Sequence, residues 1–405
     1  MKKHNILIIV DTLKIGGGSD KFAAILGSEL HEQGYNISYL TLMDGDPKYS
    51  FKGDYQTLDE TDIYGNNFKR GLDLLRYSRR IKSICEELKI DTVISAGDPA
   101  NFQAIMSRFL FGNRVRLIIT QHMNPGIFLD SPLRYRLIKF FYPLADEVVC
   151  VSQAIEKILN EDYGVKNTRT IYNMMEIEKN IELSTEELPG EYKELFEGDN
   201  FNFINMGRLD RQKGQWFLIR SFRGVVDHHK NARLFILGEG DLRGELEDLI
   251  KKLDLKENIF LLGDQKNVFP FFRKSDCFIF SSLWEGLPLS LIESISLNIP
   301  VISTDCKTGP REILCPELDL DEKINYPYLG QYAVLTQPFP NQLFFKDLNE
   351  VPLSKSEKTL SELLIRMIED SDFRKKYTNG HEIAKNFDKK EIINNWNNLL
   401  KPCKK

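Results

Sequence analysis

Cysteine is scarce in this chain of 405 residues, and long apolar runs are missing. The six cysteines include no Cys-x-x-Cys pair, which argues against a disulfide framework and against a structural zinc site. No stretch approaches the roughly 18 apolar residues of a membrane-spanning helix. A signal peptide is not indicated, because the apolar run Asn5–Val10 is short and ends at Asp11. We therefore expect a soluble, reduced, cytoplasmic protein.

Positive charge is also too limited for a general nucleic-acid binder, since the formal net charge is −5. Hydrophobic residues make up 42% and charged residues 28% of the chain, as in folded globular proteins. Residues 66–145 nevertheless hold 13 Lys and Arg against 6 Asp and Glu, a net of +7. That basic region indicates either an anionic ligand or surface met on one side, or ordinary solvated helix faces.

Short β-branched runs alternate with helical patterns, and the alternation starts twice. The predicted strands are Asn5–Val10, Asn36–Leu42, Thr92–Ser95, Arg116–Thr120, Glu147–Val151 and Thr168–Tyr172, then Phe201–Met206, Arg233–Leu237, Asn258–Leu262, Asp276–Ser281 and Pro300–Ser303. Most are apolar on both faces, as in parallel sheets covered by helices. The fold class is therefore α/β, with two doubly wound, Rossmann-like domains facing each other across a cleft.

The predicted domain boundaries follow from the same pattern. The first domain spans residues 1–175, and an acidic stretch without strand pattern at 176–200 is interpreted as a linker. The second domain spans 201–387. Residues 388–405 form a C-terminal helix that we expect to return to the first domain.

The segment Ser281–Leu314 carries the most specific pattern. A strand ends, Glu285-Gly286-Leu287 follows, Pro288 starts a helix, and Glu293 lies in its second turn. Unbonded N–H groups at a helix start bind anions or hydroxyls, and two carboxylates can accept hydrogen bonds from a sugar. The alternative is a helix with ordinary N-terminal acids.

With its Glu-x7-Glu spacing, this segment resembles the retaining glycosyltransferases of family 4, which have the GT-B fold. The resemblance implies that Glu285 contacts the donor sugar and that Glu293 contacts the ribose hydroxyls. It implies that the backbone around Gly286, Leu287 and Pro288 meets the sugar and the diphosphate. The continuation VISTDCKTGPREI is similar to members that build lipid-linked or surface glycans.

Two further segments match the same family. In Asn205–Phe222, Arg208 and Lys213 follow a strand, and two cations there can neutralise a diphosphate as its bond to the sugar lengthens. In isolation such cations are usually only solvated. After the first strand, Gly17 and Gly18 fall on the family's glycine pair, which suits close approach of a phosphate or an acceptor.

The remaining site candidates also follow predicted strands. His122 is expected to hydrogen-bond and position the donor sugar, the alternative being a structural histidine. In the resembled family, Gly263 to Val268 would surround the nucleotide. The catalytic set is thus Glu285, His122, Arg208 and Lys213.

No metal and no other cofactor is expected. Asp44-Gly45-Asp46 and Asp319-Leu320-Asp321 each read Asp-x-Asp, a pattern that elsewhere holds a divalent cation. The first lies away from the matched motifs, and the second lies in an acidic run. Arg208 and Lys213 already supply the charge that a metal would provide.

The resemblance implies a metal-independent glycosyltransferase that moves a hexose or an N-acetylhexosamine from a nucleotide-diphosphate donor, with a UDP-sugar favoured. The acceptor would be a hydroxyl of a lipid-linked or surface glycan. The alternatives are a sugar-nucleotide epimerase or a phosphorylase on the same fold, and a non-catalytic binding or scaffold protein.

The acceptor prediction extends to a surface of the first domain. Cations and aromatics alternate at Arg134, Arg136, Lys139, Phe140 and Phe141, a mixture suited to an anionic membrane interface. Attachment would then be peripheral and sensitive to salt. The alternative is a basic soluble face with residues 140–142 in the core.

Overall fold

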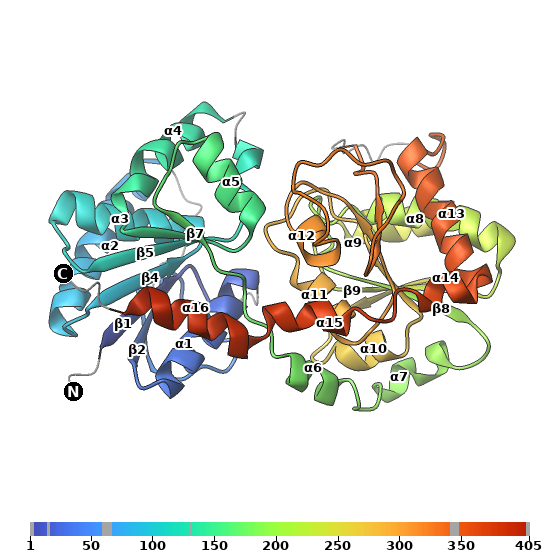
Figure 1. Ribbon diagram of the computed structural model, residues 1–405, viewed down its shortest axis with the longest axis horizontal. Helices are drawn as coiled ribbons and strands as arrows, with labels where there is room; N and C mark the ends of the chain where they lie inside the picture. The colour runs from blue at the N-terminus through green and yellow to red at the C-terminus, as the bar shows by residue number, and fades with distance from the viewer. Residues whose placement is uncertain (1–3, 14–16, 59–66, 129–130, 341–347, 402–405) are drawn as a thin grey trace. The chain divides into compact units, whose positions relative to one another are not determined.

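The computed structural model describes residues 4–13, 17–58, 67–128, 131–340 and 348–401, with no side-chain description for residues 67–73 and 128. The chain divides into two compact units, each built on a seven-stranded sheet (Figure 1). Unit 1 comprises Met1–Met174 together with Lys390–Lys405, and unit 2 comprises Met175–Lys389. The predicted class of two Rossmann-like α/β units is confirmed, and so is the return of the C-terminal helix to the first unit.

All strands of unit 1 are parallel, in the order β3-β2-β1-β4-β5-β6-β7. Their bounds are β1 Asn5–Val10, β2 Asn36–Thr41, β3 Asp54–Thr57, β4 Thr92–Ala96, β5 Arg116–Gln121, β6 Glu147–Cys150 and β7 Thr168–Thr170. The edge strand β3 was not predicted. Its four residues DYQT are exposed or half-buried, so they lack the apolar run that marks the other strands.

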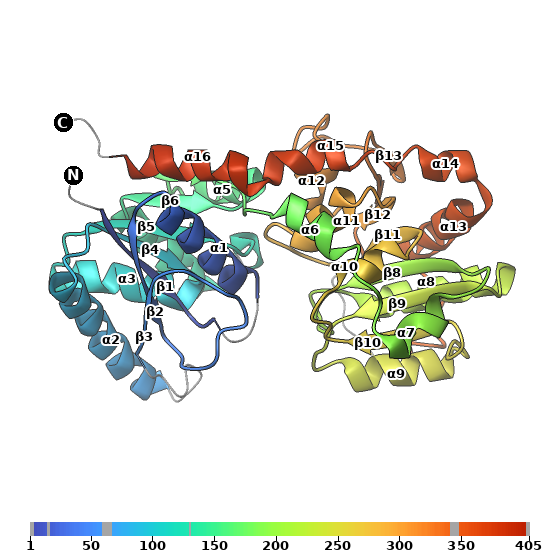
Figure 2. The same cartoon turned by 90° about the horizontal axis from the view of Figure 1, so that it is seen from below.

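Helices cover both faces of this sheet. They are α1 Gly18–Glu32, α2 Asn67–Glu87, α3 Asp98–Phe111, α4 Pro132–Phe141, α5 Gln153–Glu161 and α16 Lys389–Leu400, with short 3-10 turns η1 Pro125–Phe128 and η2 Tyr142–Leu144. Helix α16 lies beside α1 (Figure 2), where the ring centroids of Phe22 and Trp396 are 5.8 Å apart. Trp396 is fully buried in the core of unit 1. The last helix is therefore part of the fold of the first unit.

Unit 2 repeats the topology, in the order β10-β9-β8-β11-β12-β14-β13, with only β13 antiparallel to its neighbour. Its strands are β8 Phe201–Met206, β9 Ala232–Leu237, β10 Ile259–Gly263, β11 Cys277–Phe280, β12 Val301–Thr304, β13 Tyr328–Leu329 and β14 Val334–Thr336. Its longer helices are α8 Gln215–His228, α9 Arg243–Lys252, α11 Leu289–Ser296 and α13 Lys355–Glu369. Shorter ones are α6 Ile177–Leu183, α7 Gly190–Lys193, η3 Glu194–Phe196, α10 Phe269–Arg273, α12 Pro310–Leu314, α14 Ser371–Lys375, α15 His381–Ala384 and η4 Lys385–Phe387.

The stretch 176–200, interpreted as a linker, belongs to unit 2 and contains α6 and α7. Its aromatic side chains attach it to the domain. The ring of Phe196 stacks on Phe235 of β9 at 4.0 Å, and the Tyr192 hydroxyl donates to the carbonyl of Leu262 at 3.3 Å. The acidic composition suggested a linker, whereas these two aromatic side chains attach the stretch to the domain.

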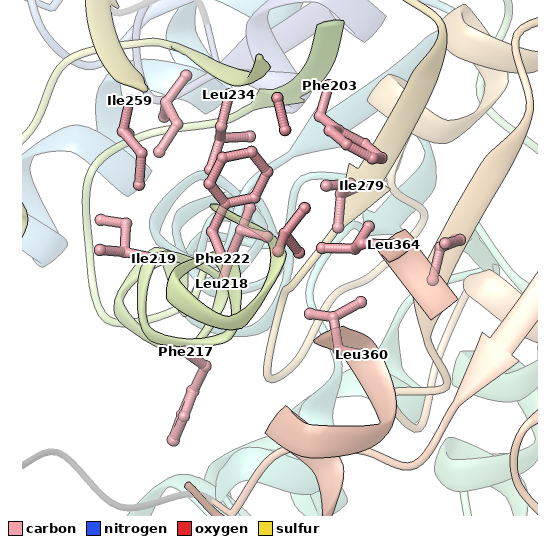
Figure 3. Close-up of a cluster of buried hydrophobic side chains, with 14 of the residues drawn as sticks. Phe203, Phe217, Leu218, Ile219, Phe222, Leu234, Ile259, Ile279, Leu360 and Leu364 are labelled. Atoms are coloured by element: carbon pink, nitrogen blue, oxygen red, sulfur yellow. The ribbon is translucent and has the colours of Figure 1, made fainter. Parts of the chain in front are cut away.

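The core of unit 2 lies between the sheet and the helix pair α8 and α13 (Figure 3). The ring centroids of Phe222 of α8 and Phe203 of β8 are 5.7 Å apart, and Leu360 and Leu364 of α13 belong to the same cluster (Figure 3). Helix α13 starts at a capping box, in which the hydroxyl of Ser354 accepts from the backbone N–H of Glu357 and the Glu357 carboxylate accepts in return.

Both sheets are doubly wound, so each has a point where successive connections leave in opposite directions. That point lies between β1 and β4 in unit 1 and between β8 and β11 in unit 2. Ligands of open α/β sheets bind beside the carboxyl ends of the strands at this point. Within the described residues, no helix combines the length and apolar character needed to cross a membrane.

Candidate functional site

The strongest candidate site lies at the carboxyl ends of β8 and β11, where the strand order of unit 2 reverses. Strand β8 leads into Gly207 and Arg208, and β11 leads into the loop that carries Glu285. The two motifs are more than 70 residues apart in the sequence. Parallel pairing of β8 with β11 brings the loops that follow them to the same edge of the sheet.

A buried ion pair connects the two loops. The Nζ of Lys213 lies 2.7 Å from Oε1 of Glu285, and the Gln212 side-chain amide donates to Oε2 at 3.0 Å. Glu285 is 6% exposed, so both carboxylate oxygens are held in a largely dry environment. A buried charge is tolerated because it is paired and hydrogen-bonded.

Backbone contacts fix the geometry of this pair. The Ser281 hydroxyl donates to the carbonyl of Lys213 at 2.8 Å, and the N–H of Leu283 donates to the carbonyl of Gln212 at 2.8 Å. Gly214 has a φ of +62°, and a Cβ there would lie 2.6 Å from the carbonyl oxygen of Ser281. Only glycine therefore allows the start of α8 to approach the β11 loop so closely.

Arg208 is the exposed cation of the site. Its guanidinium lies 3.1 Å from the carboxylate of Asp210, and 67% of its side chain is exposed. Its backbone is fixed by Gln215 of α8, whose amide donates to the Arg208 carbonyl at 3.0 Å. A surface pair of this kind is weak, so the guanidinium can turn toward an anionic ligand.

Helix α11 starts beside the ion pair. Its first residue is Leu289, so Pro288 takes the position before the helix rather than the first helical one. Among the described residues, no acceptor is found for the backbone N–H groups of Gly286 and Leu287. Glu293 lies in the second turn, as predicted, and is buried. These N–H groups can bind a negatively charged group of a ligand.

The loop after β12 supports this helix start from the side. The Thr308 hydroxyl donates to the backbone carbonyl of Glu285. Gly309 has a φ of +93°, and a Cβ there would lie 2.3 Å from Cδ of Pro288. Burial raises the pKa of the neighbouring Cys306 thiol, which therefore stays protonated.

Gly263 and Val268 lie on the β10 side of the same sheet. Gly263 ends β10 and accepts a backbone hydrogen bond from Gly238, which follows β9, at 2.9 Å. Val268 is the residue before α10. Both lie at or after the end of β10, at the carboxyl edge of the sheet that also carries Arg208 and Glu285.

His122 lies in unit 1, directly after β5. Its Nε2 lies 2.8 Å from Oγ1 of Thr120, whose hydroxyl donates to the carbonyl of Ser95 at 2.8 Å. The hydroxyl hydrogen is thus committed, so Nε2 carries the imidazole proton and donates. Burial lowers the pKa of His122 to about 4, so the ring is neutral at pH 7.

The other nitrogen of this ring, Nδ1, has an unused capacity to accept a hydrogen bond. Nδ1 is buried and has no partner within the described residues. The ring stands edge-on to Phe22 of α1, with centroids 4.7 Å apart. A neutral imidazole in this tautomer can accept one hydrogen bond, for example from a sugar hydroxyl.

The glycine pair lies at the start of α1. Gly17 precedes the helix and Gly18 begins it, and both are exposed with open space where a Cβ would be. Gly16, which precedes the pair, lies outside the described residues. Space at a helix start is consistent with close approach of a ligand.

Sequence reasoning missed three residues that the structure adds. Gln212 and Thr308 hold Glu285, and both stood next to matched residues in the sequence. Asp98 begins α3 at the reversal point of unit 1 and interacts with Gln121 and Tyr142. Burial raises the pKa of Asp98, and the charge of Arg134 offsets this only in part. Its position directly after β4 was the available signal.

No metal cluster is found in the described part of the chain: nowhere do three His, Cys, Asp or Glu side chains gather in a suitable group. Asp44 and Asp46 are exposed, as are Asp319 and Asp321. The five described cysteines are buried and free, and Cys403 lies outside the described residues.

The predicted acceptor or membrane surface is partly exposed. Arg134, Arg136, Lys139 and Phe140 lie exposed on α4, and Phe141 is half-buried. Tyr142 is fully buried, and its hydroxyl donates to the side-chain oxygen of Gln121 at 2.7 Å. The alternative that placed residues 140–142 together in the core therefore applies to Tyr142 and not to Phe140.

Comparison with known proteins agrees with this geometry. Residues 16–179 match the family model described as Glycosyltransferase Family 4, and residues 191–319 match the one described as Glycosyl transferases group 1. An uncharacterized glycosyltransferase of Methanocaldococcus jannaschii is 47% identical over 338 residues, which cover 81% of this chain and 83% of that protein.

Two more distant proteins share most of the chain's length. One is the N-acetylgalactosamine-N,N'-diacetylbacillosaminyl-diphospho-undecaprenol 4-alpha-N-acetylgalactosaminyltransferase of Campylobacter jejuni, 29% identical over 321 residues and covering 77% of each chain. The other is the crystal structure of Anabaena HepE in complex with UDP and glucose. It has a TM-score of 0.74 and 17% identity, and covers 98% of this chain and 99% of that one.

Proposed function

We propose, given that this chain belongs to the family 4 glycosyltransferases with the GT-B fold, that it transfers a hexose or N-acetylhexosamine with retention of configuration. The favoured donor is a UDP-sugar, and the acceptor is a hydroxyl of a lipid-linked or surface glycan. One observation carries the proposal. The pair of Lys213 and Glu285, with Arg208 beside it, lies at the strand-order reversal of unit 2.

The charges of this site suit a sugar diphosphate. Arg208 and Lys213 would meet the phosphates, and the free N–H groups before α11 would add positive potential. Glu285 would accept hydrogen bonds from the sugar hydroxyls, and Glu293 from the ribose. The buried neighbours of Glu285 keep its carboxylate fixed before the donor arrives, so little reorganisation is needed during reaction.

The proposed step is substitution at the anomeric carbon on the face that the phosphate leaves. The bond between that carbon and the phosphate oxygen breaks, and a bond to the acceptor oxygen forms on the same face. The acceptor proton passes to the departing phosphate oxygen, which balances the reaction. Lys213 and Arg208 stabilise the charge that develops on the diphosphate. No protein nucleophile and no metal ion takes part in this scheme.

The donor and acceptor classes draw support from the relatives. The HepE structure was determined with UDP and glucose, and the Campylobacter relative is named for transfer onto a diphospho-undecaprenol glycan. By analogy, unit 2 of this chain would bind a nucleotide-sugar and unit 1 would receive the acceptor. An acceptor carried on a lipid would bring the protein to a membrane, as a peripheral partner of its anionic surface.

A thermal-shift screen against UDP-, GDP- and ADP-sugars, followed by transfer assays, tests the proposal. Native-state binding raises the unfolding temperature according to ligand concentration over Kd. A UDP-sugar should raise it most, and Arg208→Ala should reduce the shift. Donor alone yielding an isomerised sugar would indicate an epimerase, and sugar phosphate formed with inorganic phosphate would indicate a phosphorylase. If no nucleotide-sugar raised the unfolding temperature, the result would favour a non-catalytic scaffold protein.

A further inference from the structure

Exposed apolar side chains gather on one part of unit 1. Among the described residues, ten large hydrophobic side chains are exposed, and six of these belong to the stretch 109–140. These six are Phe109, Leu110, Met123, Ile127, Leu133 and Phe140. Single exposed hydrophobics are ordinary, but a concentration of this kind marks an interaction surface.

Ring contacts join the ends of α3 and α4 into one patch. The ring centroid of Phe109, near the end of α3, lies 6.4 Å from that of Phe140 and 5.9 Å from that of Phe141, both in edge-to-face geometry. The rings of Phe140 and Phe141 are 4.9 Å apart. Phe109 is 52% and Phe140 60% exposed, so each ring presents a face to solvent while its neighbour supports it.

Helical geometry extends the patch along α4. Leu133 and Phe140 are seven residues apart and therefore lie on the same face of that helix. Leu133 is 69% exposed, the highest value among the described large hydrophobics. We define the α3–α4 surface by Phe109, Leu110, Leu133, Arg136, Lys139 and Phe140.

The charge beside these apolar groups has one sign. Helix α4, PLRYRLIKFF, contains three cations and no acidic residue. On α2, by contrast, Arg80 and Lys82 pair with Glu87 and Glu86 at 2.8 and 3.4 Å. Arg136 and Lys139 lie exposed on α4 and can therefore contact an anionic partner.

We propose that the α3–α4 surface inserts into the interface of an anionic lipid membrane. This rests on the proposed function, in which the acceptor is carried on a lipid. Phe109, Leu110, Leu133 and Phe140 enter the boundary between headgroups and acyl chains, and Arg136 and Lys139 contact lipid phosphates. Aromatic rings and long cationic side chains are the groups that such an interface accommodates.

Apolar insertion changes the expected response to salt. Binding that depends on charge alone disappears when salt screens it, whereas buried apolar area is retained in salt. Binding to anionic vesicles should therefore weaken with added NaCl but level off above zero. A purely electrostatic attachment would fall to zero instead.

Sedimentation of the full chain with vesicles tests the inference. The vesicles contain phosphatidylcholine alone or mixed equally with phosphatidylglycerol. The wild type should bind the mixed vesicles, and Phe109→Ser/Phe140→Ser should bind about tenfold less because two apolar groups are lost. Arg136→Glu/Lys139→Glu should also lose about tenfold, at low salt only.

Matched variants on unit 2 control for general effects. Val351→Ser removes an apolar side chain that is 51% exposed, and Lys358→Glu reverses an exposed helical charge. Both should bind vesicles like the wild type. Thermal unfolding of every variant checks that the fold is kept.

The two proposals fail separately. The paired variants should show the wild-type thermal shift with a UDP-sugar, because none of these side chains belongs to the site of unit 2. Equal binding of wild type and paired variants would overturn the membrane inference. So would a wild-type dimer that Phe109→Ser/Phe140→Ser converts to a monomer, because a second copy would then cover the surface.

Discussion

Lys213 and Glu285 form a single ion pair, 2.7 Å between Nζ and Oε1, although 71 residues separate them in the chain. One follows β8 and the other follows β11, the two strands at which the order of the unit 2 sheet reverses. Two motifs that are separate in the sequence therefore make one site.

Replacing Glu285 by Gln should lower the transfer rate by about 10²–10³-fold, since it removes a fixed charge while keeping the shape of the side chain. The amide retains hydrogen-bonding groups for Lys213, so the protein should stay folded. Glu285→Ala is the less informative change, because it leaves the Lys213 ammonium without its partner. Initial rates and thermal unfolding, measured together, check this. A variant with near wild-type turnover would contradict the site assignment.

Replacing Lys213, the cation of the ion pair, should lower the free energy of unfolding. Lys213→Met leaves a carboxylate that is 6% exposed without its cation, and we expect about 2–4 kcal/mol loss in the free energy of unfolding. The double variant Lys213→Met/Glu285→Met should lose less than the sum of the single ones. Urea unfolding of all four proteins measures the coupling, and strict additivity would argue against a direct pair.

Gly214→Ala should destabilise the protein by about 2–3 kcal/mol, because its Cβ would meet the Ser281 carbonyl in a left-handed backbone conformation. Gly244→Ala on α9 is the matched control. It has open space for a Cβ, so it should stabilise by about 0.4–1 kcal/mol. Unfolding midpoints separate the two, and similar effects at both positions would contradict the close approach of the loops.

The stability contribution of His122 should depend on pH. Its pKa is about 4 in the folded chain and near 6.5 when unfolded, so the unfolded chain binds the proton first as pH falls. The contribution is complete above pH 6.5 and decreases down to about pH 4. At pH 5 the loss should be about 2 kcal/mol relative to pH 7. Urea unfolding of wild type and His122→Gln at both values tests this, since the variant should lack that part of the pH dependence.

Removing divalent cations should leave the transfer rate nearly unchanged. In the proposed reaction, Arg208 and Lys213 would supply two positive charges at the phosphates, which is the role that a metal would otherwise serve. The test is the initial rate with EDTA against added Mg²⁺ or Mn²⁺. A strict metal requirement would show that these two side chains are insufficient and would direct attention to the Asp-x-Asp pairs.

A substitution of Arg208 tests whether this residue contributes to donor binding. Because its side chain is 67% exposed and, among the described residues, pairs with Asp210 alone, Arg208→Ala should leave the unfolding temperature nearly constant. It should weaken donor binding by about tenfold or more through the lost charge-assisted contacts. Titration calorimetry with UDP compares the two proteins, and equal affinity would remove Arg208 from the site.

The sequence was sufficient for elements with strong internal patterns. Strands β1 and β8 have the predicted bounds. Strand β3 was missed because an edge strand buries little and so has no apolar run. The stretch 176–200 was misread because acidic composition outweighed Tyr192 and Phe196, which anchor it to unit 2.

The site shows a similar division. Arg208, Lys213 and Glu285 were proposed from the family resemblance and from their positions after predicted strands, and parallel pairing of β8 with β11 brings their loops to one edge of the sheet. Their roles stay predictions. The contacts of Gln212 and Thr308 could not be predicted, since they depend on the path of loops rather than on any pattern. Nor could sequence separate Phe140 from Tyr142, because their burial depends on tertiary contacts such as the hydrogen bond to Gln121.

The anomeric configuration of the product distinguishes transfer with retention from transfer with inversion. The protein is incubated with the UDP-sugar that gives the largest thermal shift and a lipid-linked glycan acceptor, and the new linkage is examined by proton NMR. We expect transfer with the configuration of the donor retained, and loss of that product with Glu285→Gln. An inverted linkage, or no transfer from any nucleotide-sugar, would contradict it.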